Sequence, residues 1–131
     1  MHLEVCIKYR DKFRILVCGG RDCRDFGSVY FALDCVIREF GLAHEGILII
    51  SGGAKGADEF GEEWAHDLGV SCEIEYADWG KFGKGAGPKR NQKMLDDYSP
   101  HLIIAAPGGV GTADMKRRAR SEFVEVIEIP L

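Results

Sequence analysis

Hydrophobic and polar residues follow two patterns that alternate along the chain. Short runs in which most residues are apolar are typical of strands that are covered on both faces of a sheet. The runs that predict strands span residues 13–18, 46–51, 70–76, 101–106 and 123–129. The chain is therefore expected to be built around a five-stranded sheet.

Between these runs, hydrophobic residues recur every three or four positions, which is the spacing of a helix that buries one face. In the segment 25–40, for example, Phe26, Val29, Leu33 and Phe40 fall on one such face. Further helices are predicted over residues 57–68, 88–98 and 112–121. Strands that alternate with helices form right-handed β-α-β units. The predicted fold class is α/β: a single Rossmann-like domain with a mainly parallel five-stranded sheet and helices on both faces.

Residues 1–131 are expected to form one domain, because this length suits a single hydrophobic core. Residues 3–9 alternate between apolar and polar side chains, which predicts a half-buried strand. Residues 1–12 would thus add an N-terminal edge strand and a turn. The segment 77–87 is expected to be the one long irregular stretch, because four glycines interrupt it.

Three glycine-rich turns follow three of the predicted strands. They are Gly19-Gly20, the run from Gly52 to Gly56, and the run from Pro107 to Thr112. Glycine can adopt positive φ and brings backbone N–H groups close to a ligand without a Cβ in the way. In parallel sheets, ligands bind beyond the carboxyl ends of the strands. Thr112 is a predicted N-cap, and the helix behind it would offer free N–H groups to an anion.

Several side chains near these turns are candidates for ligand contacts. Arg90 and Asn91 begin a predicted helix in a locally basic segment of an otherwise acidic chain, which favours an anionic ligand. Asp58 and Asp114 lie near helix starts, where each either complements the helix dipole or contacts ribose hydroxyls and acts as a base. Trp79 either covers the core or stacks on a base.

Composition narrows the function classes. The net charge is −4 at pH 7, whereas a nucleic-acid-binding domain is usually basic. No apolar run reaches the length of about 18 residues that a transmembrane helix needs, and the charged N-terminus does not fit a signal peptide. The five cysteines include no C-x-x-C pair and are typical of reduced cytosolic thiols. We expect a cytoplasmic protein with no membrane association, no metal and no cofactor.

Neither a dinucleotide fingerprint nor a P-loop is present, but four segments together resemble a known family. They are Gly19-Gly20-Arg21-Asp22, Ser51-Gly52-Gly53-Ala54-Lys55-Gly56-Ala57-Asp58, Ala77-Asp78-Trp79 with Ala86-Gly87-Pro88-Lys89-Arg90-Asn91 and Met94-Leu95, and Pro107-Gly108-Gly109-Val110-Gly111-Thr112-Ala113-Asp114-Met115. Their joint spacing, over roughly residues 13–129, resembles the YspA-like branch of the SLOG superfamily. That superfamily also contains the LOG cytokinin-activating phosphoribohydrolases and the DprA DNA-processing proteins.

The resemblance implies a Rossmann-like domain that binds a nucleotide or nucleotide-derived ligand, as a sensor or a ligand-sequestering domain. LOG enzymes cleave an N-glycosidic bond with an arginine, matched here by Arg90, and a glutamate whose place Met115 takes. A thioether can neither stabilise an oxocarbenium-like centre nor activate water. The alternative function, LOG-like hydrolysis of a nucleoside monophosphate, would therefore need Asp114 or Asp58. A DprA-like DNA-binding module is the least favoured hypothesis.

The predicted site draws on all of these segments. Its ligand contacts are predicted to be Gly19, Gly20, Arg21, Gly52, Gly53, Lys55, Gly56, Asp58, Trp79, Arg90, Asn91, Pro107, Gly108, Gly109, Gly111 and Thr112. If the protein is an enzyme, its catalytic residues are predicted to be Arg90 with Asp114 or Asp58. Because relatives commonly pair through their helices, the resemblance also predicts a homodimer, and DNA is not an expected partner.

Overall fold

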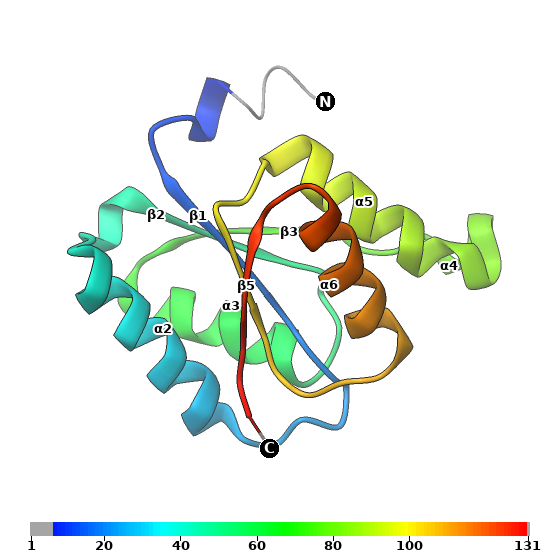
Figure 1. Cartoon of the computed structure of the whole chain (residues 1–131), viewed down its shortest axis with the longest axis horizontal. Coiled ribbons are helices and arrows are strands. Elements are labelled where there is room, and N and C mark those ends of the chain that lie inside the picture. The colour runs from blue at the N-terminus through cyan, green and yellow to red at the C-terminus, as the bar shows by residue number, and fades with distance from the viewer. Residues whose placement is uncertain (1–6, 131) are drawn as a thin grey trace.

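The computed structural model describes residues 7–130. Within them, five strands form one parallel sheet in the order β3-β2-β1-β4-β5, which confirms the predicted α/β class (Figure 1). The strands are β1 (Phe13–Cys18), β2 (Ile47–Ser51), β3 (Ser71–Ile74), β4 (Leu102–Ala105) and β5 (Glu125–Glu128).

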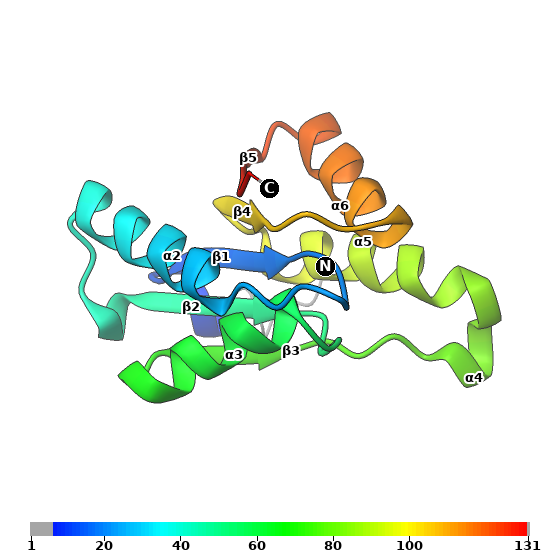
Figure 2. The same cartoon turned by 90° about the horizontal axis from the view of Figure 1, so that it is seen from below.

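Helices lie on both faces of the sheet, as predicted. Helices α2 and α3 cover one face and α5 and α6 cover the other, while the short α4 projects from the rest of the domain (Figures 1 and 2). Their bounds are α2 (Phe26–Phe40), α3 (Ala57–Leu68), α4 (Trp79–Phe82), α5 (Ala86–Tyr98) and α6 (Val110–Ser121), with short 3-10 turns at His44–Gly46 and Gly83–Gly85. Within residues 7–130, none of the helices has the length and apolar character needed to cross a membrane.

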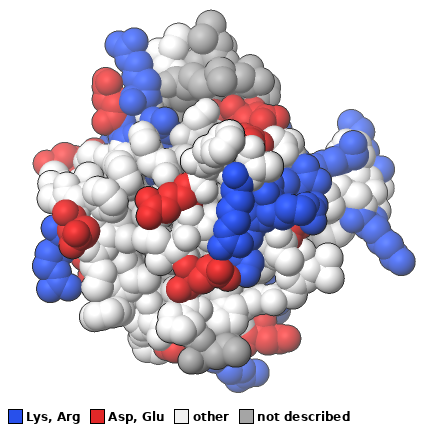
Figure 3. All heavy atoms as spheres, in the orientation of Figure 1, with Lys and Arg blue, Asp and Glu red and all other residues white. Residues whose placement is uncertain are grey.

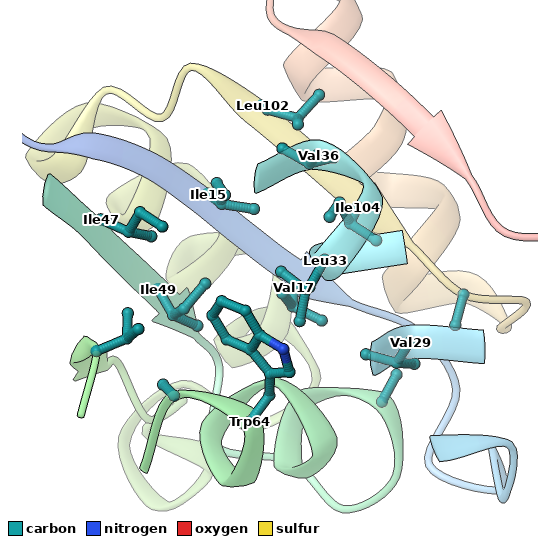
Figure 4. Packing of buried hydrophobic residues seen from close by; sticks show 14 residues of the cluster. Ile15, Val17, Val29, Leu33, Val36, Ile47, Ile49, Trp64, Leu102 and Ile104 are labelled. Carbon is teal, nitrogen blue, oxygen red and sulfur yellow. The ribbon is translucent and has the colours of Figure 1, made fainter. Parts of the chain in front are cut away.

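Each strand supplies side chains to two cores, because successive residues point to opposite faces. Ile15 of β1 packs with Trp64 in the core beneath α2 and α3 (Figure 4). Its neighbour Leu16 packs with Met94 in the core beneath α5 and α6. Since both faces are covered, the central strands are apolar along nearly their whole length.

The strand order reverses beside β1. The first half of the chain runs from β1 through β2 to β3, and α5 then returns the chain to β4 on the other side of β1. Val17 of β1 therefore pairs with Ser51 on one side and with Ile104 on the other. The connections that leave β1 and β4 go to opposite faces, to α2 and α6. In open α/β sheets, this divergence creates the crevice in which ligands bind.

Helix α2 has well-formed ends, but two of the residues on its predicted buried face are exposed. Asp25 caps the helix by accepting a hydrogen bond from the Ser28 N–H at 3.0 Å, and Gly41 ends it at φ 61°. Phe26 and Phe40, however, are 58% and 52% exposed, although the spacing predicts a buried face. They lie at the two ends of α2, where they contact other rings at the margin of the core.

The predicted N-terminal edge strand is wrong where the structure describes it. Residues 7–9 are helical and lead into a turn, in which the Lys12 N–H donates to the Tyr9 carbonyl at 3.0 Å. Tyr9 is buried and its ring lies 6.5 Å from that of Tyr98 in α5. Over residues 7–9, the structure thus has a helical turn with one buried tyrosine in place of the predicted strand. The rest of the predicted strand, residues 3–6, lies outside the described residues.

The stretch 77–87, predicted to be irregular, is largely helical. The Asp78 carboxylate caps α4 by accepting from the Lys81 N–H at 3.0 Å, and a 3-10 turn joins α4 to α5. Helix α5 already begins at Ala86, so that Pro88 lies in its first turn. Proline is tolerated there because the first N–H groups of a helix have no intrahelical acceptor.

Candidate functional site

The three glycine-rich turns converge at the carboxyl ends of β1, β2 and β4. The Gly20 N–H donates to the Pro107 carbonyl at 2.9 Å, which joins the first turn to the third. Together with α4, α5 and α6, the turns surround a cavity of about 350 Å³, which we call cavity 1. Cavities that bind small molecules in proteins typically have volumes of about 300–1,000 Å³.

Cavity 1 brings together most of the predicted ligand contacts. Those that line it are Gly19, Gly20, Arg21, Gly52, Asp58, Trp79, Arg90, Asn91, Gly109, Gly111 and Thr112. Sequence reasoning did not assign five further lining residues to the site: Cys18, Ala54, Gly87, Met94 and Met115. Four of the five, Ala54, Gly87, Met94 and Met115, belong to the segments that carry the family resemblance, and this membership is the signal by which the sequence could have assigned them to the site.

The remaining predicted contacts lie outside the lining of cavity 1 and shape the turns. Gly56 has φ 81°, and a Cβ there would lie 2.3 Å from the Gly20 carbonyl oxygen. A Cβ on Gly53 would meet the ring of Tyr76. A Cβ on Gly108 would lie 2.2 Å from the Thr112 hydroxyl oxygen. These close approaches make the glycines necessary for the packing of the turns.

Two other predicted contacts, Lys55 and Pro107, are exposed and also lie outside the lining of cavity 1. Lys55 sits at the tip of the second turn. Pro107 belongs to the wall of a neighbouring cavity. Neither side chain faces the ligand space formed by the three turns.

Arg90 is held in a fixed position at the wall of cavity 1. Its Nη1 donates to the carbonyl oxygens of Gly52 and Glu75, and its Nε donates to the Asn91 amide oxygen at 3.3 Å. The side chain is half-buried, and this burial lowers the pKa of the guanidinium, although the nearby Asp58 carboxylate opposes the shift. No hydrogen bond of Nη2 to any of residues 7–130 is present, so this nitrogen can donate to an anion in the cavity.

Asp58, in the first turn of α3, is 5% exposed and lines the same cavity. Burial raises the pKa of its carboxyl to about 6, and the Glu62 charge adds to the shift. The Ala54 N–H, which donates to Oδ2 at 3.3 Å, and the Arg90 charge act in the opposite direction. A buried carboxyl with a raised pKa in a cavity is a common feature of functional sites.

We predict that Asp58→Asn stabilises the protein at pH 7.5. The pKa of about 6 in the folded chain lies above the ordinary value of 3.8, so ionisation costs folding free energy once the pH exceeds both values. The asparagine should raise the free energy of unfolding by about 1–3 kcal/mol at pH 7.5. This gain should vanish as the pH falls through 6 to below 4, where both states bind the proton.

Urea denaturation across this pH range measures the effect. Asp11→Asn is the matched control, because the Asp11 side chain is 91% exposed. If Asp58→Asn lowers the free energy of unfolding at pH 7.5, or raises it by an amount that does not change with pH, ionisation of Asp58 does not destabilise the folded chain.

Asp114, the other candidate carboxylate, lies outside the lining of cavity 1. It accepts hydrogen bonds from Asn91 Nδ2 at 3.0 Å, from Arg117 at 2.6 Å and from Arg118 Nε at 2.8 Å. Burial opposes its ionisation, but these hydrogen bonds and charges hold the pKa of Asp114 below its usual value. Since Asn91 also binds the Gly111 carbonyl and accepts from Arg90, Asp114 positions the amide that orients Arg90.

Helix α6 starts at the cavity without a capping side chain. Its first residue is Val110 and its N-cap is Gly109, so the prediction of Thr112 as the N-cap is wrong. The Thr112 side chain packs against Gly108 inside the first turn of the helix. Among residues 7–130, no side chain caps α6, so its first N–H groups and the positive end of the helix dipole are left without a capping partner at cavity 1.

Comparisons with known proteins agree with this architecture. A family model for the YspA, cpYpsA-related SLOG family matches residues 13–82, which extend from β1 through α4. The chain belongs to this SLOG family. It is also 32% identical over 121 residues to the Gene 61 protein of Mycobacterium phage D29, an alignment that covers 87% of this chain and 94% of that protein. No solved structure matches the chain.

Charge is unevenly distributed over the surface of this SLOG domain. Although the chain is acidic, Lys and Arg gather on the face formed by α6 and around α4 (Figure 3). The row on α6 comprises Lys116, Arg117, Arg118 and Arg120. Each of these side chains is paired with an acidic partner, either Asp114 or Glu128. The basic row therefore stabilises α6 and β5, but its four cations share only two carboxylates, so the row keeps an excess of positive charge.

Trp79 stands at the rim of cavity 1, on the short helix α4. It is 49% exposed, and the Arg21 guanidinium lies 6.0 Å from the centre of its ring. Its ring also approaches Gly87, where a Cβ would lie 3.3 Å away. A half-exposed indole beside a cavity and an arginine is a suitable surface for stacking a planar group.

Proposed function

We propose that this SLOG domain binds a nucleotide or nucleotide-derived ligand in cavity 1, as a sensor or as a domain that sequesters the ligand. The observation that carries the proposal is the pairing of two anion-binding devices across one cavity. The uncapped start of α6 lies on one wall and the Arg90 guanidinium on another. Such a pair suits a phosphate group, whose oxygens can accept from backbone N–H groups and from arginine together.

The rest of the cavity fits the other parts of a nucleotide. Asp58 lines the cavity from the first turn of α3. Its carboxylate can accept hydrogen bonds from ribose hydroxyls, whereas it would repel a second phosphate. The Trp79 indole at the rim provides a face for the base. We therefore place the phosphate at Gly109–Thr112, the ribose at Asp58 and the base at Trp79.

Retention of the ligand, as opposed to turnover, is supported by the chemistry of the α6 wall. Met115 is 1% exposed and lines cavity 1 at the position where LOG enzymes carry a glutamate. Asp114, one residue earlier, is engaged by Asn91 and two arginines. No carboxylate of α6 among the described residues therefore faces the cavity.

One observation favours an alternative, N-glycosidic hydrolysis of a nucleoside monophosphate. Asp58 is buried in cavity 1 and its pKa is raised to about 6. A carboxyl of this kind can act as a general acid or base near neutral pH. In this alternative, Asp58 activates the attacking water and Arg90 binds the phosphate.

Mass spectrometry separates the two functions. The protein is incubated with nucleoside monophosphates, diphosphates, NAD, ADP-ribose and cyclic nucleotides, and both bound ligand and free products are recorded. We expect one intact compound to be retained and no free base to be released. Release of free base by the wild-type protein, and not by Asp58→Asn, would instead establish the hydrolase.

We predict that Trp79→Ala weakens nucleotide binding about 5- to 150-fold, since stacking on an aromatic side chain contributes about 1–3 kcal/mol per base. The half-exposed position of Trp79 predicts little change in folding stability. Phe82→Ala is the matched control, because Phe82 is 41% exposed on the same helix and lies outside the lining of cavity 1.

Tryptophan fluorescence follows binding directly. The other tryptophan, Trp64, is buried and donates to Asp34 at 3.1 Å, so Trp79 should carry the signal change. A fluorescence response that persists in Trp79→Phe, or equal loss of affinity in the Trp79→Ala and Phe82→Ala variants, would contradict the placement of the base.

A further inference from the structure

A second cavity lies directly beside cavity 1, on the side of the sheet that α2 covers. Its volume is about 570 Å³, and we call it cavity 2. The two cavities share Gly20, Arg21 and Gly109, which belong to the turns after β1 and β4. The hydrogen bond from Gly20 to Pro107 closes these turns into a ridge between the cavities. A ligand that reaches this ridge from cavity 1 thus has a second space open to it.

The ridge is suited to an anionic group. Two of the three shared residues are glycines, so the backbone is directly accessible, and the third is an exposed arginine. The uncapped start of α6 at Gly109 adds the positive end of a helix dipole. A phosphate bound here would have one substituent on each side of the ridge.

The walls of cavity 2 indicate the chemistry of the second substituent. Asp22, Arg24, Asp25 and Ser28 provide its polar groups. Both carboxylate oxygens of Asp25 already accept hydrogen bonds from Ser28 at the start of α2. Among residues 7–130, no hydrogen-bond or ion-pair partner of the exposed Asp22 and Arg24 side chains is present, so both can bind a ligand.

The Asp22 carboxylate can accept hydrogen bonds from hydroxyl groups of a ligand, and the Arg24 guanidinium can donate hydrogen bonds to them. The two aspartates of cavity 2 are balanced by Arg21 and Arg24, so its wall has no net charge to attract a further ionic group, and residues such as Val29 and Ile129 add apolar surface. The space therefore favours an uncharged, hydroxyl-bearing group with an apolar face, as in a sugar ring.

We propose that cavity 2 is a second lobe of the ligand site, and that the ligand is a nucleoside diphosphate whose terminal phosphate carries a sugar. The nucleoside occupies cavity 1, the diphosphate crosses the ridge of Gly20, Arg21 and Gly109, and the sugar enters cavity 2. This inference rests on the proposed function, because it assumes that cavity 1 holds the nucleoside.

Matched pairs of compounds test the proposal with the full chain. ADP is compared with ADP-ribose, UDP with UDP-glucose and GDP with GDP-mannose, by calorimetric titration. Within at least one pair, the sugar-bearing compound should bind about fivefold or more tightly, as one or two hydrogen bonds to charged groups would provide. Asp22→Ala should remove this preference and leave the affinity for the plain diphosphate unchanged, whereas Asp11→Ala should change neither.

Cys23 supplies an independent readout, because this half-buried thiol lines cavity 2 and not cavity 1. The sugar-bearing compound should slow alkylation of Cys23 by iodoacetamide, measured by peptide mass mapping, and the plain diphosphate should not. Cys35 on α2 lies outside both cavities and serves as the internal reference.

The outcomes distinguish this proposal from the function on which it rests. If diphosphates bind but the sugar adds no affinity and leaves Cys23 alkylation unchanged, the second lobe is refuted and nucleotide binding stands. If none of the six compounds binds but a monophosphate, a cyclic nucleotide or NAD is retained in the mass-spectrometry experiment, the second lobe is likewise refuted and nucleotide binding stands. If no compound of either set binds, both proposals are overturned.

Discussion

Gly52→Ala should abolish most nucleotide binding and leave the fold largely intact. A Cβ at this position would lie 2.5 Å from Nη1 of Arg90 and 2.9 Å from Oδ2 of Asp58. The backbone of the second turn is fixed, so the arginine side chain must move away and lose its hydrogen bond to the Gly52 carbonyl. We expect affinity to fall about 30- to 100-fold, the equivalent of one lost charge-assisted hydrogen bond of about 2–3 kcal/mol.

Gly85→Ala is the matched control for this variant. Gly85 has φ −78° at the start of α5, and a Cβ there would meet no atom within 4 Å. Calorimetric titration should therefore give wild-type affinity for Gly85→Ala. Wild-type affinity for Gly52→Ala as well would show that the position of Arg90 against the second turn does not matter for binding.

Among alanine substitutions of the turn glycines, Gly56→Ala should cause the largest loss in the free energy of unfolding. The residue has φ 81° and ψ −127°, a conformation that L side chains rarely adopt, and its Cβ would lie 2.3 Å from the Gly20 carbonyl oxygen. The obstructing atoms are backbone atoms, so they cannot rotate away. Backbone strain and overpacking each cost about 1–3 kcal/mol, and we expect a combined loss of about 3 kcal/mol or more.

Urea denaturation measures this loss, and Gly69→Ala separates its two causes. Gly69 has φ 68° at the end of α3, but a Cβ there would meet nothing within 4 Å. Its substitution should cost only the backbone strain, about 1 kcal/mol. Equal losses in the two variants would mean that the close approach of the second turn to the first contributes nothing to stability.

The arrangement of the sheet could be predicted from the sequence because burial on both faces leaves a simple pattern. The run Ile47–Ile50 is apolar at every position, which only a strand covered on both faces requires. The glycine turns could be placed because they follow these strands. Because the carboxyl ends of parallel strands meet at one edge of the sheet, the sequence alone predicts that Gly19, Gly52 and Gly109 lie close together, and all three line cavity 1.

The predictions that the structure corrects rest on sequence patterns that fit two different structures. Alternation over a few residues fits a strand, yet Tyr9 is buried by a helical turn. The role of Asp114 depended on its partners, and the i+3 and i+4 positions of Arg117 and Arg118 were a signal for an ion pair along a helix. Cavity 2 had no sequence signal, because its walls combine α2 with the end of the chain after β5.

Titration of the retained nucleotide into wild-type protein and Arg90→Ala tests the central claim most directly. Arg38→Ala is the matched control, because Arg38 is exposed in the last turn of α2, outside both cavities. We predict that Arg90→Ala loses affinity about 100-fold, as removal of a half-buried, charge-assisted hydrogen-bond donor to a phosphate should, and that Arg38→Ala binds like wild type. Equal affinities in all three proteins would show that cavity 1 does not hold the nucleotide, and the proposed function of this domain would be refuted.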